Sequence, residues 1–537
     1  MTLSRREAIE LLGVSAVQLL TVGAVSAQPQ SEIRPRMPLD EFVKNDKWVA
    51  SLRRGVQEMK IRLPSDPLSW FFQAAMHAVS SDLLAAAAAQ DPKVNDIFQK
   101  RYWNQCPHFG ENSANFLPWH RGYTYYFEKI LRIHTGDTGF SLPYWNYKDK
   151  GNRKFPREFG IEHMDANLNN NDPKNINPLY HKERDYYLCG YEHPFATGLP
   201  ILELSDSAVD DSLSMDADVF FGETEREGLG GGIADEDPST RGLLESYPHD
   251  QIHRAVGGII GDKAGGMASP PTAAFDPIFP FHHSNIDRLW AEWSCKQGKK
   301  WGKLPSNYWF NERAWFFYDS DGTVVNEPRK SFFDYRAMGI KFKYEDPKCT
   351  PLALPDMARA PLENAIPAIK RIETLAQGPK AFTVLPGQRT VVSFGKETRQ
   401  GIAKGINAQK NRGNATPRMV LRLHGVQLGT MHATGFDVHF TTKTTTELMR
   451  SDKSFIGSLA MFRHGAHGGH EHDSAAGDTM TESFDLSVAA SAIENANHEG
   501  LSVVFVPYTL LTVPGKTTLF TEGSMPRVGG VEFLHIQ

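Results

Sequence analysis

The chain has 537 residues, of which 40% are hydrophobic and 23% charged, and its formal net charge is -5. This length predicts two or three domains, because one hydrophobic core rarely grows beyond about 250–300 residues. The sequence holds no basic block, so charge gives no reason to expect nucleic acid or a stable membrane association, and we expect a small-molecule partner.

Residues 1–27 predict an export signal. Paired arginines, Arg5 and Arg6, precede an apolar run from Leu11 to Val25 and small residues that suit a cleavage site. The segment resembles a bacterial twin-arginine signal, which implies the twin-arginine export machinery as a partner and a periplasmic or secreted protein. Because that route carries folded proteins, it favours a preloaded metal or redox centre. The alternative is a buried amphipathic helix.

Four cysteines, at positions 106, 189, 295 and 349, would meet an oxidising compartment after export. They are too few and too scattered to predict a disulfide scaffold or a zinc ribbon.

Two kinds of periodicity divide the remaining chain. Within residues 28–345, segments such as "DPLSWFFQAAMHAVSSDLLAAAAA" and "FLPWHRGYTYYFEKILRIH" place apolar residues at helical spacing. Residues 346–380 are rich in proline and predict a linker. Residues 381–537 hold short segments of period two, from "FTVLPGQRTVVSF" to "GVEFLHI". We therefore predict a mainly helical domain followed by an all-β sandwich or barrel.

A pair of histidines in "YPHDQIHRAVGG" has the spacing of a metal site. His249 and His253 are four residues apart, so a helix would present both rings on one face. Pro248 places His249 at a helix start. The pair is weak evidence alone, because about one such pair is expected by chance among so many histidines.

A second pair, His282 and His283, precedes a helix that carries Asn285, Asp287 and Arg288. A single histidine here would more often be a core residue with satisfied hydrogen bonds. Two adjacent histidines with an amide, a carboxylate and a guanidinium nearby are more typical of a ligand with its supporting residues.

The amino-terminal half offers three further histidines. His77 lies in the middle of an apolar helical pattern, His108 follows Cys106 and Pro107 in a loop, and His120 opens the next predicted helix. Each has a structural interpretation alone. Together the two histidine groups, with no thiolate or carboxylate pattern among them, favour copper over a hard cation or a thiolate zinc site.

Five segments occur in an order and spacing that resemble those of the type 3 dicopper proteins, namely tyrosinases, catechol oxidases and relatives. They are "CPH", "FLPWHRGYTYYFE", "LPYWNY", "PHDQIH" and "FDPIFPFHHSNIDRLW". The resemblance implies a four-helix bundle holding two copper ions, with O2 as co-substrate. It implies oxidation of o-diphenols to o-quinones and ortho-hydroxylation of monophenols. The implied ligands of one copper are His77, His108 and His120, and those of the other are His249, His253 and His283, with His282 beside them.

The resemblance also assigns roles beyond the ligands. Glu245, four residues before His249, matches the glutamate that holds a water near the copper, although an exposed loop carboxylate is the alternative. Asp250 stands where hydroxylating members often carry an asparagine, and an aspartate there would accept a proton or repel Glu245. Cys106 corresponds to a cysteine that forms a thioether with the following histidine, here His108, in fungal members. A free or disulfide-bonded Cys106 is equally open.

The entrance to the site is implied to lie at Met267 to Pro270, including Ser269, where plant enzymes often carry a phenylalanine. No bulky ring stands there, which predicts an open entrance.

The β domain resembles the carboxyl-terminal domain of plant-type polyphenol oxidases, which implies a lid that keeps the enzyme latent. Its segment "FRHGAHGGHEHD" holds His464, His467, His470 and His472. This is either a solvated loop or a loop that collects copper for the site below.

Three other activities remain open at this stage. An o-aminophenol oxidase and a haemocyanin-like O2 carrier would use the same six ligands. A di-iron oxidase would need paired glutamates and Glu-x-x-His motifs on facing helices. The pocket loops decide which phenol is the physiological substrate, and the ligand motifs do not.

Overall fold

The structure is a computed structural model. It describes residues 32–95, 103–107, 113–165, 168, 172, 175–191, 201–222, 228–231, 241–260, 263–359, 372–384, 388–402, 418–426, 434–442, 447–459, 480–486, 489, 500–512 and 527–536. The predicted export signal and the histidine-rich loop around residues 464–472 lie outside these residues.

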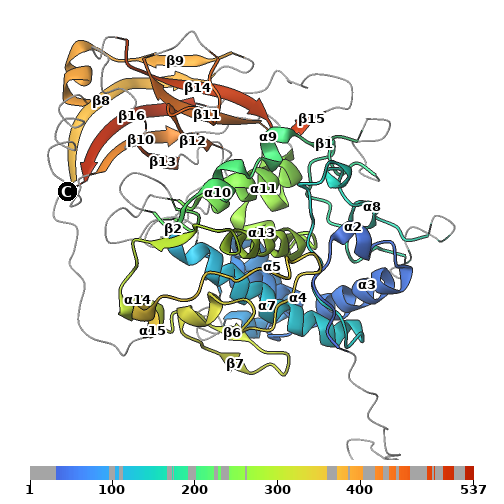
Figure 1. The fold of residues 1–537 in the computed structure, drawn as a ribbon. Coiled ribbons are helices and arrows are strands. Elements are labelled where there is room, and N and C mark those ends of the chain that lie inside the picture. Colours follow the sequence, from blue (N-terminus) through green and yellow to red (C-terminus); the bar gives the residue numbers. More distant parts are fainter. Residues whose placement is uncertain are drawn as a thin grey trace, which may run out of the picture.

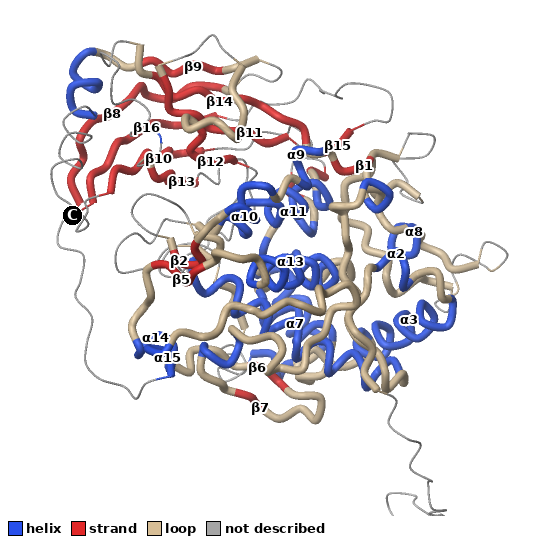
Figure 2. Tube along the Cα trace, viewed as in Figure 1, coloured by secondary structure: helices blue, strands red, loops and turns tan. Residues whose placement is uncertain are grey.

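Helices dominate the amino-terminal part (Figures 1 and 2). Its buried core is rich in aromatic side chains. Those helices are α2 (Leu39–Phe42), α3 (Asp46–Lys60), α4 (Trp70–His77), α5 (Ser81–Gln90), α7 (Phe116–Thr135), α8 (Arg157–Gly160), α9 (Asp206–Val209), α10 (Ser212–Asp216), α11 (Asp250–Gly257), α12 (Pro270–Ala273), α13 (Phe279–Ser294), α14 (Asn307–Asn311) and α15 (Asp356–Arg359). Short strands connect them: β1 (Glu203–Leu204), β2 (Val219–Phe221), β3 (Ile259–Ile260), β4 (Lys263–Ala264), β5 (Lys300–Gly302), β6 (Phe317–Tyr318) and β7 (Val324–Val325).

The apolar pattern of residues 66–89 forms two helices. Ser69 caps α4 by accepting a hydrogen bond from the Phe72 amide, and α4 ends because Ala78 is extended, with φ -165° and ψ 156°. Ser80 then caps α5. His77 is therefore the last residue of α4, and the prediction that it lies mid-helix is wrong.

Helix α13 starts earlier than its sequence pattern predicts. Pro280 occupies the first turn, where its missing amide costs nothing, so the helix includes the aromatic run that begins at Phe279. His282 and His283 consequently lie inside α13, and the prediction that they precede the helix is wrong. Both rings are thereby held by a rigid element.

The carboxyl-terminal part is a sandwich of two four-stranded antiparallel sheets, ordered β13-β10-β16-β8 and β12-β11-β14-β9. Alternate residues of both sheets point into one apolar core, as the period of two predicts. Its strands are β8 (Ile372–Thr383), β9 (Thr390–Ser393), β10 (Arg418–Val426), β11 (Thr434–Thr441), β12 (Phe455–Leu459), β13 (Met480–Asp485), β14 (Ser502–Thr509), β15 (Leu511–Thr512) and β16 (Arg527–Ile536). The predicted fold class, a helical domain followed by a β domain, is confirmed.

The strand region starts at Ile372, inside the stretch for which the sequence predicts a linker. β8 contains Pro379, whose missing N–H argues against a central strand, but β8 is the last strand of its sheet and tolerates it. The stretch between the two parts is correspondingly shorter.

The two parts are joined by more than the connecting chain. β15, which follows β14 of the sandwich, pairs antiparallel with β1 of the helical part. Leu510 and Leu511 are buried in the core of the helical part, and the Ser205 hydroxyl donates a hydrogen bond to the Thr509 carbonyl at 2.5 Å. The sandwich lies over α9, α10 and α11 (Figure 1).

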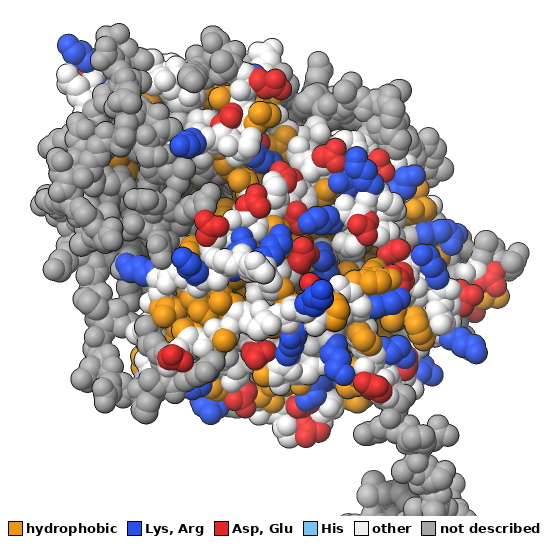
Figure 3. All heavy atoms as spheres, in the orientation of Figure 1, with side chains coloured by type: hydrophobic (Ala, Val, Ile, Leu, Met, Phe, Trp, Pro, Cys, Tyr) orange, Lys and Arg blue, Asp and Glu red, His pale blue; other side chains and the backbone are white. Residues whose placement is uncertain are grey.

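A disulfide joins Cys295, directly after α13, to Cys349. This pair is 54 residues apart in sequence, and the other two cysteines are buried thiols. Lys, Arg, Asp and Glu side chains are interspersed on the face shown in Figure 3. Among the described residues, every helix is too short or too polar to cross a membrane.

Candidate metal centre

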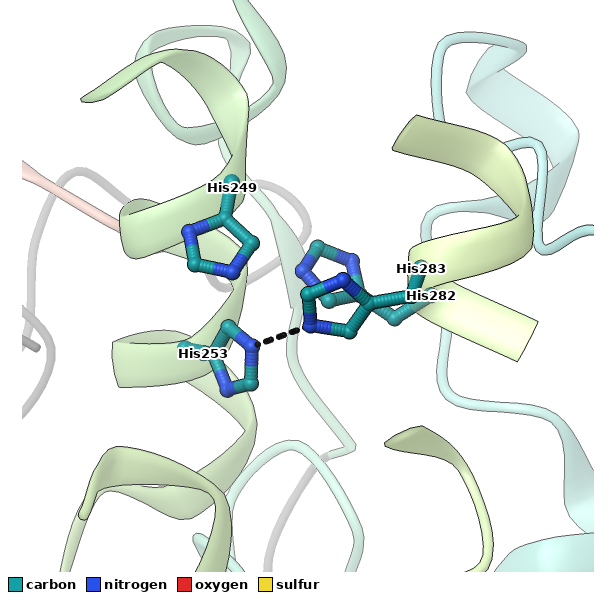
Figure 4. A group of neighbouring side chains, drawn as sticks. All are labelled: His249, His253, His282 and His283. Atoms are coloured by element: carbon teal, nitrogen blue, oxygen red, sulfur yellow. Dashed lines mark hydrogen bonds between the residues drawn. The ribbon is translucent and has the colours of Figure 1, made fainter. Parts of the chain in front are cut away.

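Four histidines from two helical segments converge at the centre of the helical part. His249 ends the π-helical turn Glu245–His249 that leads into α11, His253 lies on α11, and His282 and His283 lie on α13. Each offers a ring nitrogen, and these nitrogens all lie within 4.8 Å of one another. His253 Nε2 and His283 Nε2 are 3.3 Å apart (Figure 4). All four side chains are at most 1% exposed.

Neighbouring oxygens fix the orientation of two of these rings. His253 Nδ1 lies 2.8 Å from the Met267 carbonyl, and His249 Nδ1 lies 2.8 Å from Asp250 Oδ1 and 3.2 Å from the Glu245 carbonyl. An Nδ1–H that donates to oxygen leaves the Nε2 lone pair of the same ring available to a metal ion. The contacts therefore select the tautomer that a metal ligand needs.

A second group forms beside the first. His77, Cys106 and His120 each bring a ligand atom within 4.8 Å of the others. His120 Nδ1 lies 2.8 Å from the Phe116 carbonyl in the first turn of α7, and Cys106 Sγ lies 3.3 Å from His120 Nε2. His108 lies outside the described residues, so its predicted place in this group stays a prediction.

The two groups share one site. The rings of His120 and His283 are stacked with their centroids 4.2 Å apart and their planes at 9°. Phe116 packs against His120 at 4.5 Å and against His249 at 4.7 Å. Side chains of both groups therefore line the same buried site.

Burial favours the neutral form of three of these rings, which is the form that binds a metal ion. Burial lowers the pKa of His282 to about 3 and holds the pKa values of His253 and His283 well below the usual histidine range. Burial also raises the pKa of the Cys106 thiol well above its usual value. A site of neutral imidazoles suits copper, so these residues fit such an ion.

Three charged side chains flank His249. Glu245 and Asp250 are both buried, and the Arg241 guanidinium lies between them: its Nη2 is 3.2 Å from Glu245 Oε1 and 2.5 Å from Asp250 Oδ2. Glu245 is not the exposed loop carboxylate of the alternative interpretation. Sequence reasoning missed Arg241, for which the only signal was its position four residues before Glu245.

A buried ion-pair network connects α7, which bears His120, with α13, which bears His282 and His283. Asp287 of α13, one turn after His283, accepts hydrogen bonds from Arg121 at 2.6 Å and from Arg36 at 2.9 Å. Arg121 directly follows His120 on α7 and stacks 3.4 Å from the Trp290 ring centroid. Asp287 thus supports the histidines through the helices without contacting the metal site.

The predicted entrance lies against α11. Met267 is buried and its carbonyl is the partner of His253, while Pro270 begins α12 and Ser269 is half-buried between them. A gating role for these residues stays a prediction.

Residues 67–296 match the family model described as the common central domain of tyrosinase. Tyrosinase HcTyr1 from Hahella sp. (strain CCB-MM4) is 28% identical over 431 residues, which cover 76% of this chain and 81% of that protein. The chain therefore carries the common central domain of tyrosinase. A plant relative, the chloroplastic polyphenol oxidase of Malus domestica, is 24% identical over 498 residues, covering 90% of this chain and 76% of the relative.

A solved structure of this family shares the fold of both parts. Latent apple tyrosinase matches with a TM-score of 0.51 and 19% identity, covering 95% of this chain and 98% of the apple chain. With this domain and these relatives, the protein is a copper-dependent oxidoreductase that acts on phenols with O2 as the acceptor. Its cofactor is a pair of copper ions.

Proposed function

We propose that this protein oxidises o-diphenols to o-quinones and hydroxylates monophenols at the ortho position, and that its sandwich keeps the enzyme latent. The proposed copper ligands are His77, His108 and His120 for one ion and His249, His253 and His283 for the other. The observation that carries the proposal is the stacking of His120 on His283 at 4.2 Å, which brings the two histidine groups into one site.

The oxidation of each diphenol is a two-electron step, which suits a site with two one-electron ions. Each o-diphenol loses two electrons and two protons, and two diphenols together reduce one O2 to two waters. When bound, the copper pair supplies the route for these electrons. The protein's part is to present neutral ring nitrogens, which the contacts of His249 with Asp250 and of His253 with Met267 secure.

Proton handling falls to the carboxylates beside His249. A phenol must lose its hydroxyl proton as it approaches the centre. The buried carboxylate of Asp250 lies 2.8 Å from His249 Nδ1, and Arg241 connects it to the buried carboxylate of Glu245. Arg241 holds both of them in place, with a charge-assisted hydrogen bond to Glu245 and an ion pair with Asp250. We therefore assign the phenolic proton to this pair.

The test is a substrate panel on the copper-loaded protein, with O2 uptake and quinone absorbance measured for a catechol, a monophenol and an o-aminophenol. We expect catechol oxidation, and monophenol hydroxylation after priming with catechol. Reversible O2 binding without turnover would support a haemocyanin-like carrier instead. Faster turnover of the o-aminophenol would identify an aminophenol oxidase.

The proposal of latency rests on the position of the sandwich over α9, α10 and α11, because α11 bears His253. Cleavage within residues 346–380, followed by acid or mild detergent to separate the parts, should raise the catechol oxidation rate. Full activity of the intact chain, unchanged by this treatment, would contradict latency.

Export by the twin-arginine route rests on the sequence of residues 1–27. Replacing Arg5 and Arg6 with lysine should retain the protein in the cytoplasm of a bacterial host, while the unaltered chain reaches the periplasm or medium. Equal export of both would contradict the assignment.

A further inference from the structure

An arginine of the sandwich contacts the segment that leads into the metal centre. Arg450 lies in the loop between β11 and β12, and its side chain is 10% exposed. Its guanidinium lies 5.1 Å from the ring centroid of Tyr247 and 4.5 Å from that of Tyr508. Tyr247 belongs to the helical part and stands two residues before His249.

Arg450 is held on both sides of the boundary. Within the sandwich, its Nε donates to both oxygens of Asp437 at 2.9 Å. Across the boundary, its Nη1 donates to the Ser207 carbonyl of α9 at 3.2 Å and lies 3.5 Å from Asp210 Oδ2. The Arg450 guanidinium thus has partners in both the sandwich and the helical part, and these contacts hold it at the interface between them.

Tyr247 occupies the bend that aims His249. Its backbone is extended, with φ -140° and ψ 119°, and forms a kink inside the turn Glu245–His249 that leads into helix α11. The ring is 1% exposed and packs against Phe455 of the sandwich at 6.2 Å as well as against Arg450. The sandwich therefore supplies two of the groups that hold this bend.

We propose that Arg450 is a positioning residue for the second copper site, the one formed by His249, His253 and His283, and that it acts through Tyr247. This inference rests on the copper ligands of the proposed function. The sandwich is then a structural support of that site, and displacing it to activate the enzyme would loosen one of the two copper ions. The cation–π contact of a desolvated arginine is strong enough to change copper affinity by about tenfold.

The test separates the two copper sites. Arg450→Met is introduced into a His77→Ala chain, which retains the second site, and into a His253→Ala chain, which retains the first. Copper affinity is measured by competition with a chelator, and the electron paramagnetic resonance spectrum of the single Cu(II) is recorded. We expect about tenfold weaker binding and an altered spectrum in the His77→Ala chain, and no change in the His253→Ala chain.

Three controls complete the experiment. Arg527→Met removes an exposed arginine of β16 in the same sandwich and should change neither site. Arg450→Lys retains the charge and should restore part of the affinity. Tyr247→Leu in the His77→Ala chain should weaken copper binding as Arg450→Met does, and combining the two should add little, because both remove the same contact.

Equal weakening of both sites by Arg450→Met would indicate general destabilisation and would overturn the proposal, as would unchanged binding at both. If Arg450→Met fails to fold, the Tyr247→Leu chain carries the same comparison. The measurement uses no phenol, so its failure is distinct from failure of the proposed oxidation.

Discussion

Replacing Arg241 with methionine removes the cation that lies between two buried carboxylates. At an effective dielectric constant of about 20, its contacts at 3.2 Å with Glu245 and 2.5 Å with Asp250 correspond to roughly 5 to 7 kcal/mol each before the cost of desolvation. Removing one partner from a buried ion pair typically costs about 3 to 5 kcal/mol, because the remaining charge is left uncompensated. We expect Arg241→Met to lower the free energy of unfolding by that amount.

The catalytic effect should depend on the substrate. Asp250 would lose the contact that holds it against His249, and the carboxylate pair would lose the geometry needed to accept a phenolic proton. Because a positioned base contributes about 100-fold or more, we expect monophenol hydroxylation to fall by about 100-fold while catechol oxidation falls only several-fold.

The assay combines urea unfolding of the copper-free protein with initial rates on a monophenol and a catechol. Arg241→Lys, which keeps the charge but loses the planar fork, should lie between the wild type and Arg241→Met in both measurements. Wild-type stability and an unchanged ratio of the two rates in Arg241→Met would refute the role given to this arginine.

Other predictions concern stability and cysteine chemistry. The Cys295–Cys349 disulfide joins residues 54 positions apart, so replacing either cysteine with serine should lower the free energy of unfolding by about 4 kcal/mol. Chemical denaturation measures this change, and an unchanged midpoint would show that the bond is not formed. Burial lowers the pKa of Lys60 from 10.5 to about 8, so the folded protein loses this proton at a lower pH than the unfolded chain. The free energy of unfolding of the wild type should therefore rise by about 3 kcal/mol relative to Lys60→Met between pH 8 and pH 10.5. Parallel pH profiles of the two proteins would contradict this. If Cys106 and His108 form a thioether, the peptide that contains them will be two hydrogens lighter after reduction, and a normal mass would exclude the bond.

Much of the fold follows from local patterns. Helical spacing located α4, α7, α11 and α13, and the switch to period two located the sandwich. The exact ends depended on contacts that a periodicity does not contain. Ala78 is extended and ends α4 at His77, while Pro280 allows α13 to begin before the histidine pair.

The site was less predictable where its parts come from distant segments. The spacing of His249 and His253 indicated a shared face, but the stacking of His120 on His283 is a tertiary contact between two helices. The Cys295–Cys349 pair and the contact of Arg450 with Tyr247 join positions far apart in sequence, so they required the structure.

The dependence of catechol oxidation on copper stoichiometry tests the central claim most directly. Metal-free protein is titrated with copper, the occupancy of each sample is measured by mass spectrometry of the intact protein, and quinone formation is followed in parallel. The two histidine groups predict that chains with one copper ion are inactive and that activity follows the fraction with two. Full activity in chains that hold a single ion would contradict the account.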